Sequence, residues 1–183
     1  GAAFAQTNVT VYGSMDFGYA YLKSEDNKFS GIEGGQRNGN RVGFRGTEDL
    51  GNGLKTIWQV ANRIDASGNE DDNAWAGRDT FIGLAGDFGT VKFGRLSNPT
   101  NSGFSGAEPF SELDINGSGV YKVGEQRLAN SVRYDSPVFA GFSAAVSTQI
   151  KPENDENGAA AYASGFGLKY ETGPVALTYN RAI

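Results

Sequence analysis

Alternation of apolar and polar side chains with a period of two runs through almost the whole chain. In RNGNRVGFRG (residues 37–46), for example, Val42 and Phe44 stand between arginines. Successive side chains of a β-strand point to opposite faces of a sheet, so this period is typical of strands with one apolar face. No convincing amphipathic helix interrupts it, and Gly, Asn, Asp or Pro bound the segments. About nine strands are predicted, at residues 9–21, 37–46, 54–65, 78–86, 90–95, 126–135, 142–150, 162–170 and 175–179.

The connections between these segments alternate in length. Short connections are expected around residues 48–53, 87–89, 136–141 and 173–174, and long ones around 24–36, 66–77, 96–125 and 151–158. Short turns on one rim and long loops on the other favour an all-β fold, a transmembrane antiparallel up-and-down β-barrel. Aromatic residues near the strand ends agree with an interfacial girdle, namely Tyr19, Tyr21, Tyr134, Phe142, Tyr162, Tyr170 and Tyr179. A soluble β-sandwich has the same alternation and stays open as the alternative.

Composition excludes several kinds of site. The 183 residues include no His and no Cys, which removes most transition-metal sites, Ser-His-Asp triads and cysteine nucleophiles. The net charge of −5 argues against nucleic acid as a partner, because phosphate binding needs a basic surface. Glu108 and Glu112 could be read as a glycosidase pair, but their Gly/Ser-rich setting gives no reason for a raised pKa. We therefore expect no enzyme activity and no cofactor.

Basic residues recur on the polar faces of the predicted strands. Strand parity puts Arg37, Arg41 and Arg45 on one face and Val42 and Phe44 on the other. In a lipid-embedded barrel an arginine facing hydrocarbon would cost about 2–4 kcal/mol at the midplane, so these arginines are expected to face the lumen. The same parity predicts an inward ladder that includes Lys55, Arg63, Arg78, Lys92, Arg127 and Arg133, with Arg78 heading an inward set that contains Thr80 and Ile82.

The long segment 96–125 carries the opposite charge. Glu108, Glu112 and Asp114 lie within seven residues of one another. Folded into the lumen, this segment would set acidic groups opposite the arginines and produce a transverse field that sorts small polar solutes. The alternative is an exposed loop whose acidic residues only aid solubility.

Four stretches resemble one known family. They are QTNVTVYGSMDFG (6–18), RVGFRGTEDLGNGLKTIWQVA (41–61), GRDTFIGLAGDFGTVKFGR (77–95) and NSVRYDSPVFAGFSAAV (130–146). Each resembles strands and turns of the general diffusion porins of the Gram-negative outer membrane. The resemblance implies a homotrimer of 16-stranded barrels in outer-membrane lipid and lipopolysaccharide, each with a water-filled channel narrowed by an infolded third loop.

The resemblance also implies roles for single residues. Arg41, Arg78 and Arg127 fall where the family's pore-wall arginines lie. The loop at 66–77 corresponds to one that latches onto a neighbouring subunit, with Trp75 as a candidate anchor or else a girdle residue. The family's loop pattern is Pro-Glu-Phe, whereas this chain has Glu108-Pro109-Phe110, so the individual acidic residues at the constriction stay open.

The expected organisation is one incomplete barrel. Residues 1–5 resemble the end of a signal peptide, with a flexible tail as the alternative, and residues 6–183 would form the N-terminal part, about nine of 16 strands. The predicted function is passive diffusion of small hydrophilic solutes and ions, and the excess of inward Arg and Lys favours anions. Two alternatives stay open: a substrate-selective channel, disfavoured because Tyr12 is one of few inward aromatics, and a secreted soluble β-sandwich that binds carbohydrate.

Overall fold

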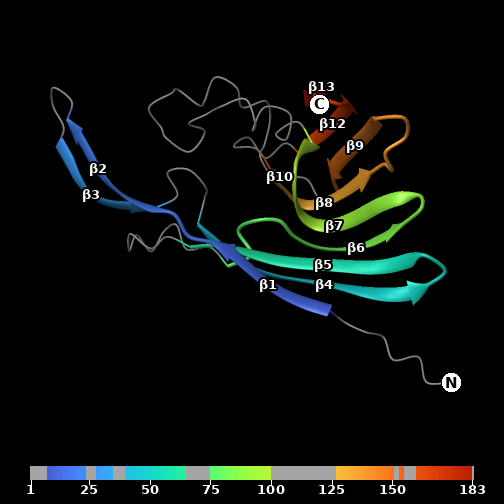
Figure 1. Ribbon diagram of the computed structural model, residues 1–183, viewed down its shortest axis with the longest axis horizontal. Coiled ribbons are helices and arrows are strands. Elements are labelled where there is room, and N and C mark those ends of the chain that lie inside the picture. Colours follow the sequence, from blue (N-terminus) through green and yellow to red (C-terminus); the bar gives the residue numbers. More distant parts are fainter. Residues whose placement is uncertain are drawn as a thin grey trace.

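The computed structural model describes residues 8–23, 28–34, 40–64, 75–99, 127–150, 153–154 and 160–182. Nine strands form one antiparallel sheet in the order β1-β4-β5-β6-β7-β8-β9-β12-β13, and two hairpins, β2–β3 and β10–β11, form separate sheets (Figure 1). The strands of the large sheet are β1 (Asn8–Ser14), β4 (Arg41–Gly51), β5 (Leu54–Arg63), β6 (Thr80–Gly86), β7 (Gly89–Ser97), β8 (Arg127–Asp135), β9 (Phe142–Gln149), β12 (Ser164–Thr172) and β13 (Val175–Ala182). The hairpins are β2 (Phe17–Lys23) with β3 (Lys28–Gly34), and β10 (Glu153–Asn154) with β11 (Ala160–Ala161).

Each strand of the large sheet pairs with the next one along the chain, apart from the hairpin insertions, so the predicted all-β, antiparallel up-and-down arrangement is confirmed. Tight turns join β4 to β5, β6 to β7 and β12 to β13. The first uses Gly51, Asn52 and Gly53, all with positive φ, a conformation that Gly and Asn adopt most easily. Nothing in the described part of the chain is a helix that could cross a membrane.

One face of the sheet, called the outward face below, is apolar and exposed. Cross-strand pairing places these side chains together: Val11, Phe44, Trp58, Val60, Ile82, Phe93, Val132, Val146, Phe166, Leu168 and Tyr179. Val11 is 64% exposed, Ile82 58% and Tyr179 58%. In a β-sandwich this face would pack against a second sheet. Within the described residues no second sheet covers it, so the sandwich alternative is wrong.

The opposite face, called the inward face, carries mostly polar and charged side chains. The same pairing gathers Tyr12, Arg45, Gln59, Phe81, Lys92, Arg133, Ser147 and Lys169 on it. The sheet is curved and twisted, with β1 at one edge and β13 at the other (Figure 1). The most buried side chains of the described residues include Leu96, Leu128, Ser131 and Ser147.

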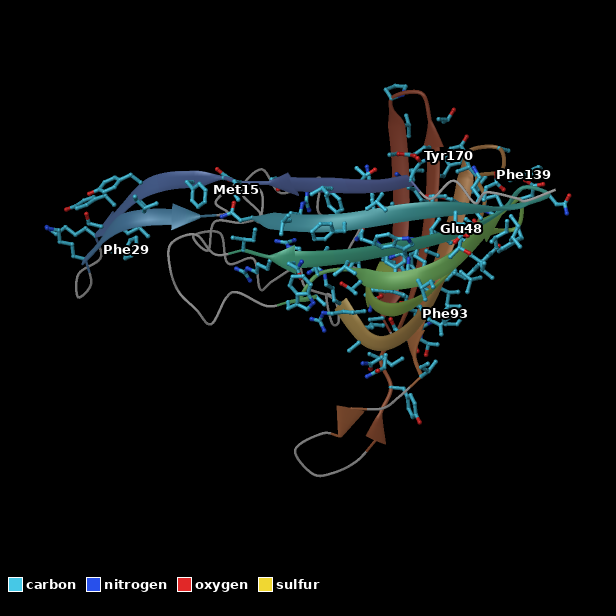
Figure 2. The ribbon with its side chains drawn as sticks, turned by 90° about the horizontal axis from the view of Figure 1, so that it is seen from below. Met15, Phe29, Glu48, Phe93, Phe139 and Tyr170 are labelled. Atoms are coloured by element: carbon cyan, nitrogen blue, oxygen red, sulfur yellow. The ribbon has the colours of Figure 1, made fainter. Side chains whose placement is uncertain are left out.

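The first predicted strand is divided in two. β1 ends at Ser14, and β2 pairs with β3 in a hairpin that extends away from the large sheet (Figures 1 and 2). At the break, the Asp16 amide donates to Asn40 Oδ1 at 2.6 Å, which replaces a strand-to-strand hydrogen bond. Tyr19 and Tyr21 belong to this hairpin, so their predicted place at the rim of the spanning sheet is wrong.

Candidate functional site

Four of the predicted basic residues lie on the inward face of β4 and β5. Arg41 pairs across the strands with Ser14 and Arg63, and Arg45 pairs with Thr10 and Gln59. Lys55 pairs with Asp49 on the same face near the β4–β5 turn. The alternation of β4 alone fixes these directions, because Val42 and Phe44 point outward between the arginines.

Tyr12 lies among the predicted arginines. Its β4 partner is Gly43, which separates Arg41 from Arg45 on the inward face. The Arg45 guanidinium carbon is 5.2 Å from the centre of the Tyr12 ring, within the range of a cation–π contact. The Tyr12 phenol lies close enough to be affected by the charges of Asp79 and of three predicted wall arginines, namely Arg41, Arg45 and Arg78.

Arg78 also lies near Tyr12, but, contrary to the prediction, it is not part of a strand. It lies just before β6, and its backbone amide donates to Ala61 O at 3.1 Å. Strand alternation therefore does not set its direction. The predicted inward set headed by Arg78 is wrong for Ile82, which is on the outward face between Trp58 and Phe93 and is 58% exposed. It is also wrong for Thr80, which has the same parity as Ile82 on β6.

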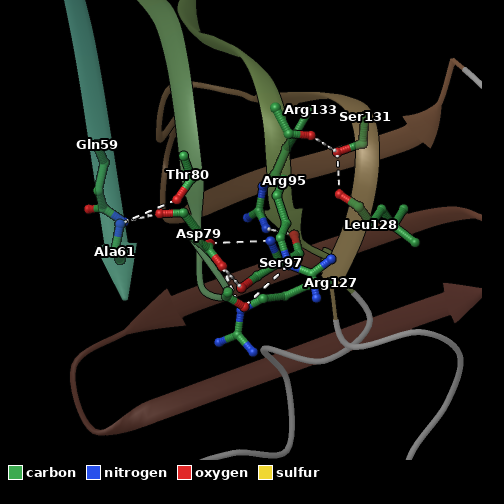
Figure 3. A network of polar contacts seen from close by, with 12 residues as sticks. Gln59, Ala61, Asp79, Thr80, Arg95, Ser97, Arg127, Leu128, Ser131 and Arg133 are labelled. Atoms are coloured by element: carbon green, nitrogen blue, oxygen red, sulfur yellow. Dashed lines mark hydrogen bonds and ion pairs between the residues drawn. The ribbon is translucent and has the colours of Figure 1, made fainter. Parts of the chain in front are cut away.

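Asp79 organises the next cluster of polar contacts (Figure 3). Its Oδ1 accepts hydrogen bonds from Ser97 Oγ at 2.7 Å and from Arg127 Nε at 2.9 Å, and its Oδ2 accepts one from the Ser97 amide at 3.2 Å. The Asp79 carbonyl accepts a further bond from Gln59 Nε2 at 2.9 Å. Arg127, a predicted wall residue, is thus held by the carboxylate of Asp79, the residue directly before β6, which was not among the predicted site residues.

A second carboxylate holds two more cations. Asp135, at the end of β8, forms ion pairs with Lys92 at 3.0 Å and Arg133 at 2.7 Å. Arg133 also donates to the Ser97 carbonyl at 2.7 Å, and Lys92 lies 5.4 Å from the centre of the Phe81 ring. This carboxylate therefore offsets one of the two positive charges and holds both side chains in place.

The chain crosses the inward side of the sheet directly after β7. Asn98 is 1% exposed, and a Cβ on Gly165 of β12 would come within 1.8 Å of its Oδ1. A Cβ on Gly167 would come within 3.2 Å of Pro99 Cβ. The Asn180 amide of β13, oriented to satisfy both neighbours, donates to the Pro99 carbonyl at 3.3 Å. Because β12 and β13 are separated from β7 by β8 and β9, these contacts bring the start of the long connection over the interior.

Other predicted residues are placed differently or are not placed. Arg37, Glu108, Glu112 and Asp114, with most of the predicted loop at 96–125, lie outside the described residues, as does the predicted signal remnant at 1–5. Trp75 is 78% exposed. The amide of the following Ala76 donates to Asn62 Oδ1 at 2.6 Å, and Asn62 has the same parity on β5 as the outward-facing Trp58 and Val60.

The chain matches known proteins in sequence and in structure. A family model described as Gram-negative porin matches residues 1–183. The major outer membrane protein P.IB of Neisseria gonorrhoeae is 37% identical over 180 residues, which cover 91% of this chain and 49% of the relative. The corresponding protein of Neisseria lactamica is also 37% identical over 180 residues, with 91% and 51% covered. The chain spans about half the length of these curated relatives.

Solved structures give the same result. The anion-selective porin from Comamonas acidovorans has a TM-score of 0.80 and 26% identity, with 97% of this chain and 57% of that chain covered. Salmonella typhi OmpF, solved in complex with daunomycin, has a TM-score of 0.55 at 17% identity, with 95% of this chain and 65% of that chain covered. The second likeness concerns the fold alone.

Proposed function

The chain belongs to the Gram-negative porin family, and from this premise we propose that it forms a wall of a water-filled channel for passive diffusion of small hydrophilic solutes and ions. Its location is the outer membrane of a Gram-negative bacterium. We propose no catalytic activity and no cofactor. We propose that Arg41, Arg45, Lys55, Arg63, Arg78 and Arg127 line the water, together with Arg37, which lies outside the described residues, and that the outward face meets lipid.

The observation that carries this proposal is the contrast between the two faces. The outward face exposes aliphatic and aromatic side chains, whereas the alternate positions of the same strands hold Arg45, Lys92 and Arg133. Lipid stabilises the first set, and a charged side chain tolerates only water or a polar partner. A sheet with one apolar face and one charged face can therefore separate hydrocarbon from an aqueous interior.

A constriction is part of the proposal. The contacts of Asn98 and Pro99 with β12 and β13 support a loop that enters the interior from the end of β7. Glu108, Glu112 and Asp114 follow on that loop, and we propose that they oppose the arginines of β4 and β5. The transverse field would orient dipolar solutes as they pass.

We further propose a preference for anions. Asp79 and Asp135 pair with Lys92, Arg127 and Arg133 and offset two of their three charges, whereas none of the ion pairs in the described part of the chain includes Arg41 or Arg45. These two arginines leave positive charge on the inward face. A similar solved structure at 26% identity is titled an anion-selective porin, which agrees with this preference.

The assembly is proposed from the relatives. We propose that residues 6–183 form the N-terminal half of one 16-stranded barrel, that residues 1–5 remain from a signal peptide, and that three barrels form a homotrimer in lipid and lipopolysaccharide. OmpT of Vibrio cholerae, whose fold is similar, has been solved in a trimer form. Trp75 is a candidate subunit contact, because it is exposed beside a turn held by the outward Asn62.

Planar-bilayer recordings of the complete protein test the proposal. We expect stepwise conductance that rises with salt concentration and a reversal potential in a KCl gradient of the sign that chloride permeation gives. Absence of conductance would overturn the channel, and the sign for potassium would overturn the anion preference. Block by one sugar at low concentration would favour the substrate-selective alternative.

A further inference from the structure

Tyr12 and Gly43 fit together on the inward face in a way that wall charge alone does not explain. They are direct cross-strand partners between β1 and β4. A Cβ on Gly43 would lie 2.5 Å from Tyr12 Cζ, 2.6 Å from its hydroxyl oxygen and 2.7 Å from Cε1. The hydroxyl end of the ring therefore occupies the space beside β4 that the side chain of any other residue at position 43 would fill.

The Tyr12 ring also lies next to the Arg45 side chain. Arg45 is the next inward residue of β4 after Gly43, and its guanidinium carbon is 5.2 Å from the ring centre. A guanidinium held against an aromatic face keeps its charge, because arginine does not lose its proton in proteins, and it keeps its edge N–H groups available. Without the ring, this long side chain would be free to sample many rotamers.

We propose that Tyr12, seated on Gly43, is a positioning residue that holds the Arg45 guanidinium at a fixed place on the pore wall and thereby sets the preference for small anions. The inference rests on the proposed channel function. Tyr12 acts through Arg45, because its ring carries no charge of its own. The aromatic face is the active part, and the hydroxyl group is dispensable.

The chain provides a matched control three residues along β4. Gly46 pairs with Trp58 on the outward face, and a Cβ there would lie 2.5 Å from Trp58 Cε2 and Nε1. Gly43→Ala and Gly46→Ala thus introduce the same methyl group against an aromatic ring, on the two opposite faces of one strand. Damage to the strand in general would affect both variants, whereas displacement of Tyr12 affects the first alone.

The test measures the chloride-to-potassium permeability ratio of the complete protein in planar bilayers with a KCl gradient. We expect Tyr12→Leu and Gly43→Ala to lower the ratio by about two- to threefold, since a displaced charge acts more weakly on ions at the wall. Tyr12→Phe should keep the ratio of the unaltered protein, and so should Gly46→Ala. If Gly43→Ala gives no channels, the comparison of Tyr12→Leu with Tyr12→Phe carries the test alone.

The decisive step is a double variant. Arg45→Gln should lower the ratio, and adding Tyr12→Leu to it should change the ratio no further, because the two residues act as one unit. An equal effect of Tyr12→Leu with and without Arg45 would overturn the positioning role. So would channels that conduct normally with an unchanged ratio in Tyr12→Leu, and that result would leave the channel function standing. Loss of all conductance in the unaltered protein would instead contradict the proposed function.

Discussion

Basic side chains have different partners in the two halves of the inward face. Around β6, β7 and β8, Asp79 holds Arg127 at 2.9 Å, and Asp135 holds Lys92 and Arg133 at 3.0 and 2.7 Å. Around β1 and β4, Arg41 and Arg45 take part in none of the described ion pairs, and Arg45 lies on the Tyr12 ring. Paired cations fix the wall in place, whereas an arginine on an aromatic ring is positioned without losing its positive field.

The largest expected effect comes from the paired half. Asp79→Asn removes the charge that accepts hydrogen bonds from Arg127 and Ser97, and the new amide nitrogen would face donors. We expect the free energy of unfolding to fall by about 1.5–3 kcal/mol, the range for hydrogen bonds to charged groups. Thermal unfolding in detergent micelles measures this change. Asp87→Asn, in the exposed β6–β7 turn, is the control, and an equal loss there would remove the distinction.

The contact at the base of the long connection gives the second effect. Gly165→Ala would push a methyl group into Asn98 and should cost about 1–3 kcal/mol by overpacking. The single-channel conductance should change as well, because the connection after β7 would no longer pack against β12 at Asn98. Asn98→Ala in the same chain should restore both values. A Gly165→Ala protein with unaltered conductance would show that the contact between Gly165 and Asn98 does not set the width of the channel.

Arginines in the two halves can be compared directly by charge removal. Arg45→Gln and Arg133→Gln remove the same charge, but Arg133 is 17% exposed and lies on Asp135, whereas Arg45 is exposed toward the interior. We expect Arg45→Gln to lower the chloride-to-potassium permeability ratio about twofold more than Arg133→Gln. Reversal potentials at 0.1 M salt measure both. Equal shifts would mean that net charge alone governs selectivity.

The smallest effect is expected at an exposed ion pair near the rim. Lys169 and Glu171 are 2.7 Å apart, but their side chains are 47% and 58% exposed. Lys169→Gln should change the free energy of unfolding by less than about 1 kcal/mol, because solvent screens such pairs. Thermal unfolding of this variant beside Asp79→Asn tests the ranking. A loss as large as that of Asp79→Asn would contradict the importance given to burial.

Parity predicted the inward and outward directions well where strands are regular. Arg41, Arg45, Lys55 and Arg63 lie on the inward face as the alternation of β4 and β5 requires. The prediction failed at Ile82, because Arg78 precedes β6 and cannot set the parity of that strand. It also failed at Tyr19 and Tyr21, where Asn40 interrupts the first strand and the continuation pairs elsewhere. The alternation of apolar and polar side chains does not indicate where one strand ends and the next begins.

By itself, the sequence determined the fold class, the two faces of the sheet and the family, because a period of two and turn residues act over a few neighbouring positions. Only the tertiary structure decided which charges are neutralised. Asp79 meets Arg127 across 48 residues and Lys92 meets Asp135 across 43, while Gly43 receives a ring from a strand 31 residues earlier. Such contacts depend on the register of distant strands and on the space a missing side chain leaves, and neither is written in any local pattern.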